Sequence, residues 1–191
     1  WIMSGRPQYD ITGMNIDRLH SYQNTPKYRA ARTVESLGNV YKCHYPFKVP
    51  QTARDCKKSP FYDRMKAAGA YFTDVSGWES PAWFAPNGKK PEVDELSWGR
   101  ENWFSYWAEE HNAAREDVII MDMSFMGKFE VNGRDAGRML NRISANEVDG
   151  DEGMITYTQW LNKDGKLEAD LTVTKINEEK FIVVVTDTMH R

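Results

Sequence analysis

The sequence has few cysteines, no long apolar run and almost no net charge, and each absence excludes a class of protein. Two cysteines, Cys43 and Cys56, are too few for a disulfide framework and too far apart for a CxxC unit. No stretch of about 18 apolar residues occurs, so no membrane-spanning helix is expected. A formal charge of −3 offers no basic surface for nucleic acid or an anionic membrane.

Motifs that would hold a metal or a nucleotide are missing as well. His44 adjoins Cys43, but no second pair of ligands follows at metal-binding spacing, so no metal site is expected. Neither GxGxxG nor GxxxxGK[ST] occurs, which leaves no dinucleotide or phosphate cradle. Reduced thiols favour a cytosolic or organellar matrix compartment. Because the chain begins at Trp1 and ends at Arg191 just after an apolar strand, we interpret it as part of a longer protein.

Helix and strand patterns mix along the 191 residues without a strict βαβ alternation, which favours an α+β fold. Thr25 followed by Pro26 predicts the start of a helix, and Gly38 its end. Asn102 is expected to cap a second helix over residues 103–117. Five of the seven tryptophans fall between residues 78 and 107, a density typical of a core or an interface.

The second half of the chain predicts strands around one short helix. Residues 118–123 read as a buried strand, and a further strand ends at the Asn132-Gly133 turn signal. Asp135 opens a short helix that is expected to turn three apolar side chains inward: Met139, Leu140 and Ile143. Residues 181–185 form a continuous apolar run, which is typical of a strand buried on both faces.

The most informative segment is a predicted hairpin from Met154 to Lys175. Asp164-Gly165 is a strong signal for a two-residue turn, and this turn places Lys163 opposite Lys166 and Leu161 opposite Glu168. Counting outward pairs Gln159 with Asp170 and Tyr157 with Thr172 on one face. The other, more apolar face is expected to meet a core and carries Thr156, Thr158, Trp160, Ala169, Leu171 and Val173.

Two alternatives remain open for the polar quartet of Tyr157, Gln159, Asp170 and Thr172. It is either a functional surface or an ordinary solvated sheet face. A three-residue loop with a glycine bulge would also shift the pairing by one residue and turn Tyr157 to the face opposite Asp170.

Several long phrases, in this order, resemble the folate-dependent N-methyl amine dehydrogenases and oxidases. The phrases are HYPFKVPQTARDCKKSPFYDRMKAAGAYFTDVSGWESPAWF, EEHNAAREDVIIMDMSFMGKFEVNGRDAGRMLNRISANEV and MITYTQWLNKDGKLEADLTV. This family comprises dimethylglycine and sarcosine dehydrogenases, whose C-terminal half is related to the aminomethyltransferase (T-protein) of the glycine cleavage system. The resemblance implies that residues 1–18 end a flavin-binding domain and residues 19–57 form a small central linker domain. Residues 58–191 would then be the incomplete first part of a T-protein-like, folate-binding domain with an antiparallel sheet.

The resemblance also implies an activity with two cofactors. FAD, bound in the missing N-terminal part, oxidises an N-methyl amine, and tetrahydrofolate takes the resulting one-carbon unit to give 5,10-methylenetetrahydrofolate. By the same resemblance, Asp170 is the catalytic residue beside the reactive folate nitrogens. Tyr157 and Thr172 contact the pterin, and Val184 approaches the cofactor mainly through its backbone. Later segments of such a domain would line the same folate cavity.

The resemblance leaves the whole protein's role open in several respects. Electrons pass either to oxygen or to an electron-transfer flavoprotein, and the compartment is a bacterial cytoplasm or the mitochondrial matrix. One alternative is a non-catalytic regulatory subunit of the same architecture, such as the one associated with a mitochondrial phosphatase. Another alternative is a stand-alone folate-dependent transferase that uses a different methyl donor.

Overall fold

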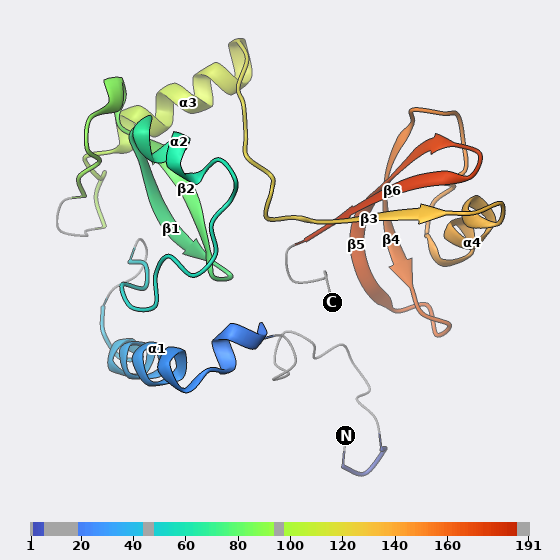
Figure 1. Ribbon diagram of the computed structural model, residues 1–191, viewed down its shortest axis with the longest axis horizontal. Helices are drawn as coiled ribbons and strands as arrows, with labels where there is room; N and C mark the ends of the chain where they lie inside the picture. The colour runs from blue at the N-terminus through green and yellow to red at the C-terminus, as the bar shows by residue number, and fades with distance from the viewer. Residues whose placement is uncertain (1, 6–18, 44–47, 94–97, 187–191) are drawn as a thin grey trace. The chain divides into compact units, whose positions relative to one another are not determined.

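The structure, a computed structural model, describes residues 2–5, 19–43, 48–93 and 98–186. The chain divides into two compact units, one of residues 19–124 and one of residues 125–191 together with residues 1–18 (Figure 1). Both units combine helices with antiparallel strands, so the α+β prediction is confirmed. The predicted end of a flavin domain at residues 1–18 lies almost wholly outside the described residues.

The unit of residues 19–124 is built around one two-stranded ribbon. Its elements are η3 (Ser21–Asn24), α1 (Pro26–Asn39), α2 (Tyr62–Ala67), β1 (Ala70–Val75), β2 (Trp78–Phe84), η4 (Pro86–Gly88) and α3 (Phe104–Glu116). β1 and β2 pair antiparallel across a tight turn at Ser76 and Gly77, both of which have positive φ. This conformation matches the right-handed twist of the two strands.

The sequence predicted the N-terminal cap of α1 correctly and that of α3 incorrectly. Thr25 caps α1 as predicted, because its Oγ1 accepts a hydrogen bond from the backbone N of Tyr28 at 3.3 Å. The helix runs through Gly38 to Asn39 instead of ending at the glycine. The predicted Asn102 cap on α3 is wrong: its side-chain amide donates to the Glu92 carbonyl at 3.1 Å, and Trp103 occupies the cap position.

The predicted strand over residues 118–123 is also wrong. This segment is neither helix nor strand, and it lies at the boundary of the two units. Val118 is 80% exposed and Ile120 fully exposed. Apolar composition does not make a strand by itself, because the backbone of a strand needs a partner for its hydrogen bonds.

A buried ion pair holds residues 50–57 against the ribbon. The carboxylate of Glu79 accepts hydrogen bonds from the guanidinium of Arg54 and, at 2.7 Å, from the backbone N of Asp55. Arg54 also donates to the carbonyl of Phe72 in β1 at 3.0 Å and to that of Pro50 at 3.3 Å. The Glu79 side chain is only 3% exposed, so its charge depends on these donors.

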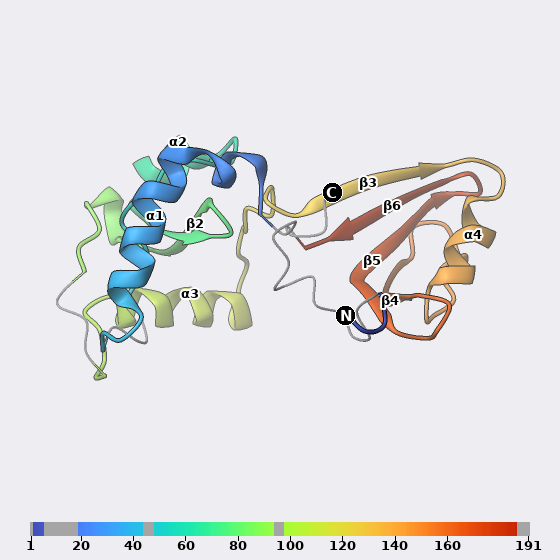
Figure 2. The same cartoon turned by 90° about the horizontal axis from the view of Figure 1, so that it is seen from below.

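The described residues of the unit that begins at residue 125 form one antiparallel sheet with one helix against it (Figures 1 and 2). Its elements are β3 (Gly127–Asn132), α4 (Ala136–Ile143), β4 (Ile155–Leu161), β5 (Leu167–Asn177) and β6 (Lys180–Val185). The strand order is β3-β6-β5-β4. Among the described residues of the chain, no helix is both long and apolar enough to cross a membrane.

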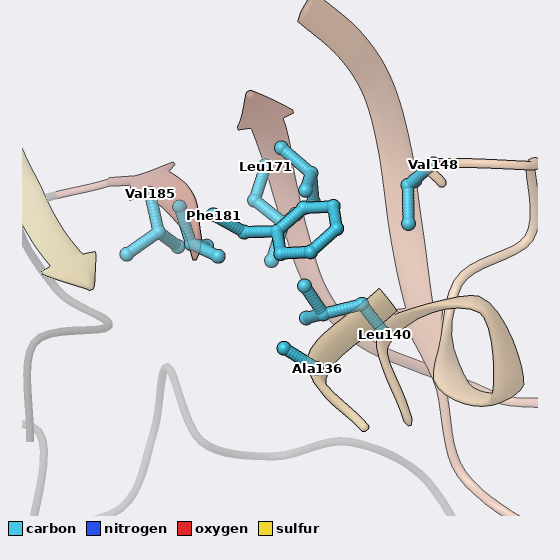
Figure 3. Packing of buried hydrophobic residues seen from close by; sticks show 8 residues of the cluster. Ala136, Leu140, Val148, Leu171, Phe181 and Val185 are labelled. Carbon is cyan, nitrogen blue, oxygen red and sulfur yellow. The ribbon is translucent and has the colours of Figure 1, made fainter. Parts of the chain in front are cut away.

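The core of this sheet lies on its α4 face. Leu140 of α4 is fully buried against the ring of Phe181, and Figure 3 shows these two side chains together with the rest of the cluster: Ala136, Val148, Leu171, Val173, Val183 and Val185. The inward prediction is therefore right for Leu140, but Met139 is 42% exposed. The prediction that residues 181–185 are buried on both faces is wrong, since Ile182 and Val184 are half-buried on the face opposite α4.

The hairpin between β4 and β5 has the predicted pairing beyond its loop, but the loop itself differs from the predicted two-residue turn. Asn162 N donates to Lys166 O at 2.9 Å, so the loop holds three residues, with Gly165 at φ 74°. Leu161 therefore pairs with Leu167, and the predicted pairs of Lys163 with Lys166 and of Leu161 with Glu168 are wrong. A β-bulge then adds one extra residue, Glu168, before Trp160 pairs with Ala169.

The loop and the bulge each shift the pairing by one residue, and the two shifts cancel. Tyr157 opposite Thr172 and Gln159 opposite Asp170 are therefore confirmed. The side chain of Asn162 stabilises both irregularities. Its Oδ1 accepts from the backbone N of Asp164 and of Lys166 at 3.0 Å each, and its Nδ2 donates to Glu168 at 2.7 Å.

Replacing Arg54 with methionine is expected to destabilise the unit of residues 19–124 by about 3–5 kcal/mol, because the Glu79 carboxylate is left buried without its main partner. The measurement is the free energy of unfolding from urea denaturation followed by tryptophan fluorescence. Lys58→Met is the matched control, since Lys58 pairs with Asp55 at the surface and its loss is expected to change little. Equal effects of the two variants would contradict the account.

Asn162→Ala removes three hydrogen bonds from the loop and the bulge, and we expect it to weaken the hairpin locally by about 1–3 kcal/mol. Amide hydrogen exchange of the β4 and β5 residues measures this loss. Lys163→Ala, in the same loop, is the control that should leave the exchange rates unchanged. Undiminished protection in Asn162→Ala would show that the register does not depend on this side chain.

Candidate functional site

The face of the sheet opposite α4 carries the residues singled out by the sequence. Tyr157 of β4 pairs with Thr172 of β5, and Thr172 pairs in turn with Val184 of β6. Paired residues of neighbouring strands share a face, so these three side chains form one row across the sheet. The row continues to Lys128, which pairs with Val184 from β3.

Asp170 lies beside this row on the same face, two residues nearer the hairpin loop than Thr172. It pairs with Gln159, whose Nε2 donates to the Asp170 carboxylate at 3.0 Å. The β5–β6 ladder ends at Leu171 opposite Val185, so Asp170 is placed just beyond the last paired residue of β6. The structure thus brings the four predicted site residues, Tyr157, Asp170, Thr172 and Val184, onto one surface.

Hydrogen bonds keep the Asp170 carboxyl in its charged form. Hydrogen bonds from the Tyr157 hydroxyl and from Gln159 hold the pKa of Asp170 below its usual range. The same bond to Asp170, together with weaker effects, raises the pKa of Tyr157. At neutral pH the pair is therefore a carboxylate beside a protonated phenol.

The site is open and mixes polar with apolar surface. Tyr157 is 62% exposed and Asp170 is exposed, whereas Thr172 and Val184 are half-buried. Next to the row, Ile182, Thr174 and Ile155 continue the same face with apolar and small polar side chains. A flat ring could lie on this surface and present its edge to the carboxylate of Asp170.

Sequence reasoning missed two members of this face. Gln159 appeared in the polar quartet but was not assigned a site role, although it donates directly to Asp170. Lys128 was not considered, and its ammonium donates to the carbonyl of Met126 at 2.9 Å. The alternation of β3 could have identified its outward positions, but only the strand order β3-β6-β5-β4 places Lys128 in line with Tyr157.

A separate cavity of about 590 Å³ lies in the unit of residues 19–124, and none of the predicted site residues lines it. Its walls come from the β1–β2 ribbon and from the start of α3, where aromatic side chains gather. The tryptophan density between residues 78 and 107 was its only signal in the sequence.

Comparison with known proteins finds relatives along nearly the whole chain. The 4-methylaminobutanoate oxidase (formaldehyde-forming) of Paenarthrobacter nicotinovorans is 37% identical over 96% of this chain. Human mitochondrial sarcosine dehydrogenase is 27% identical over 92%, and the mouse mitochondrial pyruvate dehydrogenase phosphatase regulatory subunit is 28% identical over 96%. The chain spans only about a fifth of each relative, 22%, 22% and 21% respectively.

A solved structure supports the fold of about two thirds of the chain. The glycine cleavage system aminomethyltransferase T from Bartonella henselae matches with a TM-score of 0.54 and 22% identity, over 69% of this chain and 32% of that one. At this identity the likeness shows the fold alone.

Two family models together cover almost the entire sequence. The model of the GCVT N-terminal domain matches residues 61–191, and that of the FAD dependent oxidoreductase central domain matches residues 4–59. The chain therefore belongs to the family of the GCVT N-terminal domain, and its first part matches the central domain of FAD-dependent oxidoreductases, the family that the sequence resembles.

Proposed function

We propose that the open face of the four-stranded sheet binds tetrahydrofolate in a protein that oxidatively demethylates an N-methylated amino acid. The observation that carries this proposal is the position of Asp170, an ionised carboxylate held by Tyr157 and Gln159 beside a half-apolar row. A phenol and an amide thus converge on one carboxylate.

The residues of this face fit the chemistry of a reduced pterin. Its pyrimidine ring is flat and carries N–H donors along one edge, and Asp170 can accept from these donors. The Thr172 hydroxyl can donate or accept, and the ring of Tyr157 offers a flat apolar contact. When bound, tetrahydrofolate supplies the amine nitrogens that take up a one-carbon unit, which gives 5,10-methylenetetrahydrofolate.

We assign two roles to Asp170: it orients the cofactor, and it stabilises positive charge that forms near it. A carboxylate that stays ionised can accept a proton from a neighbouring amine and can offset positive charge that develops there. Because its pKa is lowered, this capacity is present at neutral pH and is lost only when the pH falls through that low pKa.

FAD belongs to the proposal through the family alone. The sequence contains no glycine-rich dinucleotide motif, so we assign no flavin contact to this chain and place the flavin site in another part of the whole protein. We further propose residues 19–57 as the central linker domain and residues 58–191 as part of the folate-binding domain. The electron acceptor would be oxygen or an electron-transfer flavoprotein.

The relatives are bacterial and mitochondrial proteins by name. We accordingly propose a bacterial cytoplasm or a mitochondrial matrix as the compartment. Both are reducing enough to keep Cys43 and Cys56 as the free, exposed thiols that the structure shows.

Two other functions each rest on a specific relative. One relative is named as formaldehyde-forming, which would fit a protein whose one-carbon unit is released as formaldehyde. Another is a phosphatase regulatory subunit, which would fit a non-catalytic role. Flavin absorbance of the whole protein, together with turnover of sarcosine or dimethylglycine, distinguishes an enzyme from a colourless regulatory protein.

Tyr157→Phe should raise the pKa of Asp170 toward the ordinary value of about 3.9, because it removes a hydrogen bond to the charged form. NMR titration of the Asp170 side-chain carboxyl carbon measures this shift. Tyr106→Phe, in the other unit, serves as the control and should leave the Asp170 titration unchanged. An unaltered pKa in Tyr157→Phe would mean that the phenol does not hold the carboxylate.

Asp170→Ala tests the proposed function directly in a protein that joins this chain to its flavin-binding part. The fold should persist because Asp170 is exposed, but the rate of 5,10-methylenetetrahydrofolate formation should fall at least about 100-fold. Substrate oxidation should continue, with release of free formaldehyde. The control is Asp164→Ala, which removes an exposed carboxylate from the same hairpin. Unchanged methylene transfer in Asp170→Ala would remove Asp170 from the mechanism.

A further inference from the structure

The cavity in the unit of residues 19–124 is separate from the sheet face and has the size of a small-molecule site. Its volume of about 590 Å³ lies within the usual range for ligand pockets. Tyr71 and Trp83 line it from the β1–β2 ribbon, and Trp103 and Trp107 line it from the start of α3. All its lining residues belong to this one unit.

Aromatic rings form walls in two orientations around this space. Trp83 is 3% exposed and stacks on Trp103, with ring centroids 6.2 Å apart and planes 10° apart. Trp107 meets Trp103 edge-on at 6.4 Å and 84°. The faces of such rings carry negative charge density and attract cations, most strongly those with weak hydration.

Two charged residues of opposite sign line the cavity and differ in their exposure to solvent. Glu101 lines it and is buried, at 7% exposure, whereas the neighbouring Arg100 is exposed. The Arg100 guanidinium carbon lies 4.5 Å from the centre of the Phe104 ring, which keeps the positive charge at the rim. The lining therefore combines a buried acid with an exposed base.

We propose that this cavity binds an N-methylated amino acid as its zwitterion, with the methylated ammonium group among the tryptophans near Glu101 and the carboxylate toward Arg100. This inference rests on the proposed function for the choice of ligand, and it gives the chain a second binding site beyond the folate face. N-methyl groups spread the positive charge of the nitrogen and weaken its hydration, so they suit the aromatic walls. A remaining N–H of a secondary or tertiary ammonium can donate to the Glu101 carboxylate.

The two opposite charges in the cavity predict which of several related ligands binds most tightly. A methylated cation without a carboxylate would leave Arg100 unused, and a simple carboxylate would meet Glu101 with a like charge. An amino acid without N-methyl groups would satisfy both charges but would contact the rings less well. We therefore expect dimethylglycine to bind better than glycine, tetramethylammonium or acetate.

Titration of the chain with dimethylglycine, followed by tryptophan fluorescence and by calorimetry, tests the proposal. A saturable fluorescence change is expected, because several tryptophans line the cavity. Glycine, tetramethylammonium and acetate should each bind at least about tenfold more weakly. Absence of saturable binding, or equal binding of acetate, would overturn the proposal.

Two variants and one control place the binding in this cavity. Glu101→Gln keeps the shape of the side chain but removes its charge, and Trp107→Leu removes one aromatic wall at a partly exposed position. Each should weaken dimethylglycine binding about tenfold while far-UV circular dichroism stays unchanged. Glu109→Gln, on the exposed side of α3, should have no effect. If both variants fold and bind as the unaltered chain does, the ligand is not in this cavity.

The outcome is distinguishable from a failure of the proposed function. Asp170→Ala should bind dimethylglycine normally in the fluorescence titration, because Asp170 belongs to the other unit. Conversely, Trp107→Leu should leave folate binding at the sheet face intact. Loss of methylene transfer in Asp170→Ala without any dimethylglycine binding to the cavity would support the folate proposal and overturn this one.

Discussion

The register between β4 and β5 is the constraint on which the candidate site depends. Side chains alternate along a strand, so a shift of one residue would turn Tyr157 away from Asp170. A three-residue loop introduces such a shift, and the bulge at Glu168 removes it. On the core face, Thr158 is fully buried and accepts a hydrogen bond from the backbone N of Asn146, while the Trp160 indole donates to Ser144. Packing on one face thus determines which residues gather on the other.

One face of this sheet stabilises the fold, and the other carries the candidate functional residues. α4 buries the apolar residues of β5 and β6 on its own side, and this burial supplies the main stabilising term. The opposite face keeps Tyr157 and Asp170 exposed, where a carboxylate can remain charged without a desolvation cost. An open carboxylate of low pKa is suited to bind and orient a cationic or N–H-rich ring, so the division of faces agrees with the folate binding proposed for this face.

In the unit of residues 19–124, ion pairs connect segments that are distant in sequence. Arg54 and Glu79 hold an irregular segment against the β1–β2 ribbon, and Arg32 ties α1 to Asp74 of the same ribbon at 3.0 Å. Helix α1 has no buried residue of its own, so the Arg32–Asp74 pair contributes to its position. The aromatic residues are concentrated instead on the ribbon and α3, where they enclose the cavity rather than a closed core.

Local sequence signals predicted those features that depend only on residues close together in the sequence. The Thr25 cap, the alternation of β4 and β5 and the inward Leu140 all follow from spacing and residue type, and the long phrases shared with relatives identified the family. Tertiary structure alone decided the rest. Residues 118–123 have strand-like composition but no strand partner, and the exposure of Val184 depends on which face α4 covers. The bulge at Glu168 and the alignment of Lys128 with Tyr157 depend on pairing between strands distant in sequence, which no local pattern specifies.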